Sequence, residues 1–156
     1  MKLAEALAER ADASRRVEQL RSRIVSNARY QEGEEPAEDS NVLLVEASEV
    51  LDRLELLIQQ INRTNASAPF AAGMTLTDAL ARRDVLRLRH SVLSGAADAA
   101  AGREHGGYVR QLRSELRMLS ALPVAELRGQ ADQVARALRE LDVRIQQANW
   151  EVELVE

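Results

Sequence analysis

Three residues between positions 83 and 90 have types and spacing that suit anion binding. Arg83, Arg87 and His90 occupy positions i, i+4 and i+7, so they share one face of the helix expected there. Arginine forms bidentate hydrogen bonds with phosphates and carboxylates. Because Arg83 and His90 interrupt an apolar row, we expect them to be partly buried, and a buried arginine needs a carboxylate partner. A structural ion pair is the favoured interpretation, and a binding site for a small anion is the alternative.

An acidic stretch, Gln31–Asp39, is the second segment that could carry chemistry. It contains Gly33 and Pro36 and therefore predicts a loop. Its carboxylates have three candidate roles: they favour the N-terminus of the next helix, pair with the arginines, or bind a divalent cation. Glu46 and Glu49, on the next helix, are further candidate partners for the arginines. The candidate acidic residues of the loop are Glu34, Glu35, Glu38 and Asp39.

No group of residues matches the pattern of a catalytic site. His90 and Ser91 are adjacent, and neighbours on a helix point about 100° apart, so the serine hydroxyl is not presented to the imidazole. Glu104 and His105 are also adjacent and do not form the Glu-x-x-His motif of di-iron bundles. The sequence contains no cysteine, no P-loop and no dinucleotide-binding fingerprint. We therefore expect a non-enzymatic protein without a cofactor.

The composition favours helices as the elements that position these residues. Hydrophobic residues make up 46% of the 156 residues but aromatic residues only 3%, so aliphatic side chains must form the core, as in helix bundles. The net charge of −4 argues against nucleic acid as a partner. Glu5 and Glu9 interrupt the first ten residues, and no apolar run reaches the roughly 20 residues of a membrane span. We expect no signal peptide and a cytoplasmic protein.

Apolar periodicity predicts four long helices. They span residues 3–28, 41–64, 76–101 and 123–149, approximately. Asp39 or Ser40 is expected to cap the second helix. That helix is apolar over a broad arc, because the row through Leu44 and Leu51 has a second row beside it, and a broad arc implies more than one neighbour. The third helix also carries two apolar rows, one interrupted by the basic residues and one formed by Ala81, Val85, Leu88 and Val92.

The last helix has the strictest pattern. Its apolar residues step by 3 and 4 in alternation, which is the heptad spacing of a coiled-coil face. This seam comprises Val124, Leu127, Ala131, Val134, Leu138, Leu141, Ile145 and Ala148. A narrow seam on a long helix buries little surface in a lone chain, so we expect a homo-oligomer. Residues 31–62 carry nine acids and one base, and residues 82–117 carry eight arginines and four acids, so these stretches invite contact within or between chains.

The expected architecture is a mainly all-α single domain over residues 1–156, an antiparallel bundle or coiled coil. The first, second and last helices would form the bundle, and the third helix with residues 103–121 would decorate it or join subunits. Residues 108–121 suit either a helix or a short strand. Leu112, Leu116 and Leu119 have helical spacing, and an alternation of period two gives a weaker strand signal.

Five segments in order carry a family resemblance: residues 1–7, Gln31–Asp39, Ile61–Asn65, Leu76–His90 and Gln147–Trp150. Together they resemble a small all-helical bacterial family of unknown function, some of whose members carry the label septicolysin. The resemblance covers nearly the whole chain. Its label implies a membrane-active cytolysin but assigns no residues. In that family the stretch matching residues 114–124 is richer in β-branched residues, which tips residues 108–121 towards a short β arm.

Three classes of function follow from these features. The leading one is a protein that self-assembles through its helices. The second is the membrane-active cytolysin, although the mixed charges and scarce aromatic residues of these helices do not favour a membrane partner. The third is a binder of a small ligand or a divalent metal, which would use the acidic loop or the face of Arg83, Arg87 and His90.

Overall fold

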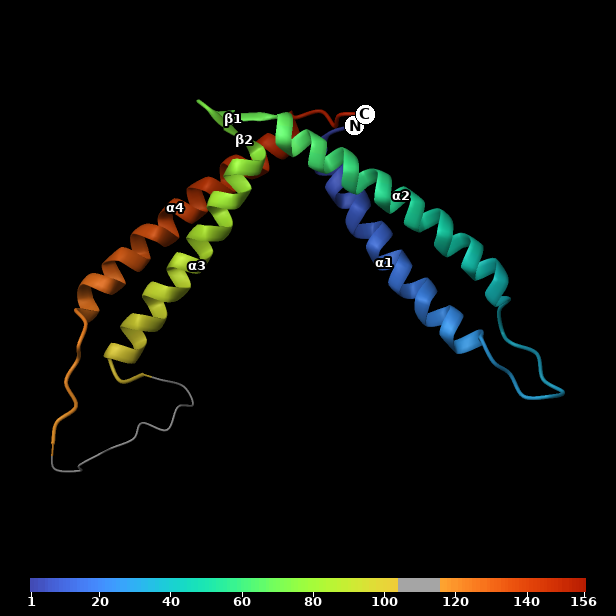
Figure 1. Cartoon of the computed structure of the whole chain (residues 1–156), viewed down its shortest axis with the longest axis horizontal. Helices are drawn as coiled ribbons and strands as arrows, with labels where there is room; N and C mark the ends of the chain where they lie inside the picture. Colours follow the sequence, from blue (N-terminus) through green and yellow to red (C-terminus); the bar gives the residue numbers. More distant parts are fainter. Residues whose placement is uncertain (104–115) are drawn as a thin grey trace. The chain divides into compact units, whose positions relative to one another are not determined.

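The computed structural model describes residues 1–103 and 116–156, and this part of the chain is mainly α-helical (Figure 1). The helices are α1 (Leu3–Asn27), α2 (Ser40–Ser67), α3 (Leu76–Ala100) and α4 (Val124–Glu151). Two short strands, β1 (Pro69–Ala71) and β2 (Met74–Thr75), pair antiparallel. The prediction of a mainly α-helical fold with four long helices is confirmed. The largest difference in helix length is at the end of α2, which reaches Ser67 rather than residue 64.

A short β arm is present, but it lies between α2 and α3 and not at 108–121, where the sequence left helix and strand open. Residues 116–121 form neither helix nor strand, and residues 108–115 lie outside the described part. A strand needs a neighbour for its backbone hydrogen bonds. The connector at 69–75 supplies both strands and a turn, because Gly73 has a φ of +72°, which glycine adopts without a steric penalty.

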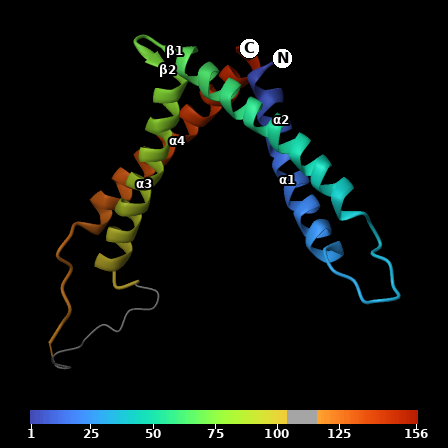
Figure 2. The same cartoon turned by 45° about the vertical axis from the view of Figure 1, so that its right-hand side comes forward.

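The described chain divides into two compact units, whereas the sequence analysis treated residues 1–156 as one domain. The first unit comprises Met1–Thr77 and Gln146–Glu156, and the second comprises Asp78–Ile145. Each unit contains one long antiparallel pair of helices, as both views show (Figure 2).

In the first unit α1 packs lengthwise on α2. Asp39 caps α2 by accepting a hydrogen bond from the backbone N of Asn41 (2.8 Å), as predicted. The broad apolar arc of α2 is only partly covered: Leu44 and Leu51 are 53% and 48% exposed. Their neighbours in the second row turn to α1, because one helix can cover only one side of such an arc. The buried apolar side chains of this pair are Leu3, Ala6, Leu20, Leu43, Leu57 and Ile61.

The two ends of the chain are joined in the first unit by a terminal clasp, formed by residues 1–3 and 152–155. The Leu3 N donates to the Val152 carbonyl (3.0 Å), and the Leu154 N donates to the Met1 carbonyl (2.9 Å). The Val155 N donates to the hydroxyl of Thr64, which is fully buried on α2 (3.0 Å). The clasp therefore fastens both ends of the chain to the last turns of α2.

In the second unit α3 packs lengthwise on α4. This pairing corrects the expectation that α3 would lie outside a bundle of the other three helices. All eight residues of the predicted heptad seam are buried or half-buried, so the seam is the face that α4 turns inward. On α3 the inward row is the one that Arg83 and His90 interrupt, and both are half-buried. Two ion pairs cross between the helices: Arg87 to Asp142 (3.7 Å) and Arg128 to Asp98 (3.0 Å).

Candidate functional site

The predicted basic row on α3 is engaged in ion pairs. The Arg83 side chain is 24% exposed and contacts the carboxylate of Asp84 (3.2 Å). Arg87 contacts Asp84 (3.5 Å) as well as Asp142 on α4 (3.7 Å). Among the residues that the structure describes, α3 and α4 provide these carboxylates, and the acidic loop and α2 do not. His90 is half-buried beside them.

The acidic loop divides into residues that have structural partners and residues that face solvent. Glu38 forms an ion pair with Arg23 of α1, and its backbone N donates to the side chain of Asn27 (3.1 Å). Glu34 and Glu35 are exposed. Within the described residues no group of three or more His, Cys, Asp or Glu side chains is placed to hold a metal ion. The loop thus closes the α1–α2 hairpin, and its geometry gives no support to the metal-binding alternative.

The pairing of Arg23 with Glu38 perturbs both groups. The hydrogen bonds from the guanidinium stabilise the carboxylate and lower the pKa of Glu38 below its ordinary 4.5. The same hydrogen bonds raise the pKa of Arg23. Both side chains are more than a third exposed, so solvent screens the pair. This is the electrostatic signature of a surface ion pair, with no sign of a catalytic acid or base.

Three ion pairs run along one edge of the α1–α2 hairpin, and we call them the ion-pair ladder. Their α1 members, at positions 9, 16 and 23, are seven residues apart and so lie on one edge of the helix. The Nε of Arg53 donates to the Glu9 carboxylate (2.8 Å). The other pairs are Arg16 with Glu46 and Arg23 with Glu38. The sequence analysis missed this ladder, although the seven-residue spacing on α1 was a visible signal.

The ladder borders a shallow groove of about 380 Å³ between α1 and α2. Its charged lining residues include Glu9, Arg16 and Arg53, which are all members of the ladder. Their hydrogen-bonding capacity is therefore already used within the hairpin. The ladder specifies how α1 and α2 align, because opposite charges at matching heptad positions favour one register.

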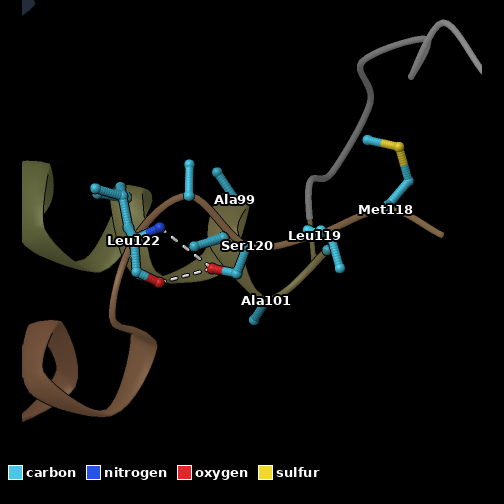
Figure 3. A pocket seen from close by; sticks show the side chains of 10 residues that line it. Ala99, Ala101, Met118, Leu119, Ser120 and Leu122 are labelled. Carbon is cyan, nitrogen blue, oxygen red and sulfur yellow. Dashed lines mark hydrogen bonds between the residues drawn. The ribbon is translucent and has the colours of Figure 1, made fainter.

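A second hollow, of about 690 Å³, lies where α3 ends (Figure 3). Small residues at the end of α3 and directly after it, Ala96 and Ala99–Gly102, line one side, and residues 118–122 line the other. The hydroxyl of Ser120 donates to the Leu122 carbonyl (2.6 Å), so the polar group drawn in this hollow is satisfied locally. Met118 and Leu119 are exposed. The lining offers apolar contact area and no group for acid–base or nucleophilic chemistry.

The feature that these contacts leave unexplained is a set of exposed apolar side chains. We define the α2 face by Val42, Val45 and Leu56, which share one side of α2. Leu44 and Leu51 are exposed on a different side of this helix, roughly 140° away at about 100° per residue. We define the α3 face by Val85, Leu88 and Val92, which belong to the outer row that the sequence analysis identified. Leu88 and Val92 are 67% and 70% exposed. Single exposed apolar residues are ordinary, but rows of them on one helix mark interaction surfaces.

No helix in the described part of the chain is long and apolar enough to cross a membrane. Both apolar faces belong to helices whose other sides carry charged residues.

The comparisons with known proteins agree with the helical fold and name no activity. A search of curated proteins gives no match. A crystal structure of a functionally unknown conserved protein from Corynebacterium diphtheriae is 41% identical, with a TM-score of 0.89 over 99% of both chains. Neither description carries the septicolysin label. The model of a family of unknown function, DUF6847, matches residues 10–154, and the chain therefore belongs to this family.

Proposed function

We propose that this chain is a non-enzymatic helical protein whose role depends on assembly with further copies of itself. The observation that supports the proposal is the pair of exposed apolar faces on α2 and α3. The α4 helix already turns its predicted seam inward, and α1 already covers the row of α2 that contains Leu43 and Leu57, so these faces are additional to what each helix pair needs. An additional apolar face is explained by a second partner.

The energetic scale of the two faces suits association. Full burial of a valine or leucine side chain stabilises by about 1.5–3 kcal/mol, so covering the exposed part of each of these side chains contributes roughly 1 kcal/mol. Each of the two faces has three such side chains, which together give on the order of 6 kcal/mol for each chain. Association itself costs roughly 4–15 kcal/mol. Covering both faces thus contributes an amount within the range of this cost, whereas covering the three side chains of the α3 face alone falls below it.

A direct test uses two differently tagged copies of the chain, expressed together. We expect the second tag to be retained when the first is captured, because copies associate. Retention should be lost in Leu88→Asp, which places a charge in the α3 face. Val25→Asp is the matched control, because Val25 is 71% exposed and belongs to neither face. Recovery of the captured tag alone from the wild-type protein would contradict the proposal.

The other two functional classes, the cytolysin and the ligand binder, predict different results for the same purified protein. A cytolysin would release dye from vesicles at micromolar protein, and a ligand binder would gain thermal stability with phosphate or divalent cations, because a ligand of the native state raises the melting temperature. Self-assembly predicts neither effect. Vesicle leakage that survives Leu88→Asp would favour the cytolysin class instead.

A further inference from the structure

The α3 face has positively charged borders. Val85, Leu88 and Val92 follow one another by steps of 3 and 4, so they form a continuous row on the outside of α3. Arg82 and Arg89 lie beside this row and are exposed. Unlike Arg83 and Arg87, neither forms an ion pair with any residue that the structure describes. The α3 face is thus an apolar row with two unneutralised positive charges at its side.

The α2 face has the opposite charge. Val45, Glu49, Asp52 and Leu56 follow one another by steps of 4, 3 and 4, so two carboxylates lie in line with two exposed apolar side chains. Glu49 and Asp52 are both exposed. Among the described residues neither has an ion-pair partner, whereas Glu46 on the same helix pairs with Arg16. The α2 face is therefore apolar with two unneutralised negative charges.

From this complementarity we propose that the α3 face of one copy docks on the α2 face of a second copy. The proposal rests on the self-assembly proposed above and names the surfaces that carry it. Arg82 and Arg89 of one copy lie opposite Glu49 and Asp52 of the other. Contact between two α3 faces would bring four arginines together, and contact between two α2 faces would bring four carboxylates together, so like faces repel and unlike faces attract. An interface between unlike faces is heterologous, and every copy offers both halves of it.

The test reverses the charge of each face in turn and then combines the variants. The first variant carries Arg82→Glu and Arg89→Glu, and the second carries Glu49→Arg and Asp52→Arg. Each variant alone places like charges on both of its faces, so we expect its association to weaken at least about tenfold. An equimolar mixture of the two should recover association, because every contact in a mixed complex again joins opposite charges. One chain that carries all four substitutions should recover it as well.

Two measurements and one control variant show whether a change in native mass comes from the two faces. The native mass is measured by light scattering, and the helical content by circular dichroism, because all four positions are exposed and the variants should fold. Arg21→Glu with Arg136→Glu is the matched control, since it makes the same change of charge at side chains that are 75% and 78% exposed and outside both faces. That control should keep the wild-type mass.

The possible negative results contradict different parts of the two proposals. A wild-type protein that is monomeric at every concentration would overturn the self-assembly and the docking together. A wild-type assembly that both reversed variants retain would overturn only the docking of α3 on α2. Variants that both lose association without recovery in the mixture would also overturn it, because the negative faces of one variant and the positive faces of the other should attract.

Discussion

Replacing Thr64 by valine removes a single hydroxyl from the most buried polar position among the residues that the structure describes. Thr64 is fully buried on α2. Its hydroxyl donates to the Gln60 carbonyl (2.7 Å) and accepts from the backbone N of Val155 (3.0 Å). Valine has the same branched shape, so the substitution leaves no cavity. It does remove the only side-chain acceptor that the structure assigns to the Val155 N, and so it opens the terminal clasp at this point.

The expected loss of stability follows from these two hydrogen bonds. The Gln60 carbonyl keeps its place in the helix, so its lost bond costs little. The N–H of Val155 loses its acceptor at a partly buried position, which costs about 1–3 kcal/mol. For a chain of 156 residues each kcal/mol corresponds to about 2–4 °C, so we expect the melting temperature to fall by about 2–12 °C.

Thermal unfolding followed by circular dichroism measures this change, and amide hydrogen exchange localises it. The amides of residues 154 and 155 should exchange faster in Thr64→Val, while those in the middle of α1 should be unchanged. Ser67→Ala is the control, because the Ser67 hydroxyl is exposed and should contribute less than about 0.5 kcal/mol. A Thr64→Val protein with wild-type stability and wild-type exchange at residue 155 would refute the role assigned to this hydroxyl.

Three further predictions concern the helices and their ion pairs. Gly129→Ala should stabilise the protein by about 0.5–1 kcal/mol, because Gly129 is inside α4 and an added Cβ meets nothing within 4 Å. Gly102→Ala should destabilise the protein, because Gly102 has a φ of +73°. Chemical denaturation compares the two variants. Each single change in one ladder pair, Glu9→Arg or Arg53→Glu, should lower the stability by about 0.2–1 kcal/mol, and the two changes together should restore it. A double-mutant cycle without coupling between the two positions would contradict the ladder. The free energy of unfolding should fall as the pH drops below about 4.5, because the folded-state pKa of Glu38 lies below its ordinary value. The contribution of the Glu38 carboxylate to stability is therefore complete above that pH and is lost as the carboxylate is protonated. Glu38→Gln should flatten the pH profile of stability in this range.

The helices could be predicted from the sequence because their signal is local. The strict 3-4 stepping from Val124 to Ala148 identifies which side of α4 turns inward without any knowledge of its partner. The same reasoning found the outer row of α3 at Val85 and Leu88, and the structure leaves that row exposed. For α2 the periodicity showed a broad apolar arc but could not tell which part of the arc α1 would cover, so the exposure of Leu44 was not foreseen.

The ion pairs depend on register, which a single sequence does not display. Glu38 was considered as a partner for Arg83 because their charges are opposite, but its partner is Arg23 on α1, the helix that precedes the loop. Asp142 was not considered for Arg87, because the antiparallel alignment of α3 and α4 brings them together from distant parts of the sequence. Charge predicts that arginines and carboxylates will pair. Only the packing of the helices decides which ones do.

The claim that this protein works as an assembly is tested most directly by its native mass in solution. Sedimentation velocity over a wide range of protein concentrations measures that mass without a tag or a substitution. We predict a mass that is a multiple of 17.3 kDa and that decreases on dilution or at high salt, because the proposed contacts are partly ionic. A mass of 17.3 kDa at every concentration would contradict the claim.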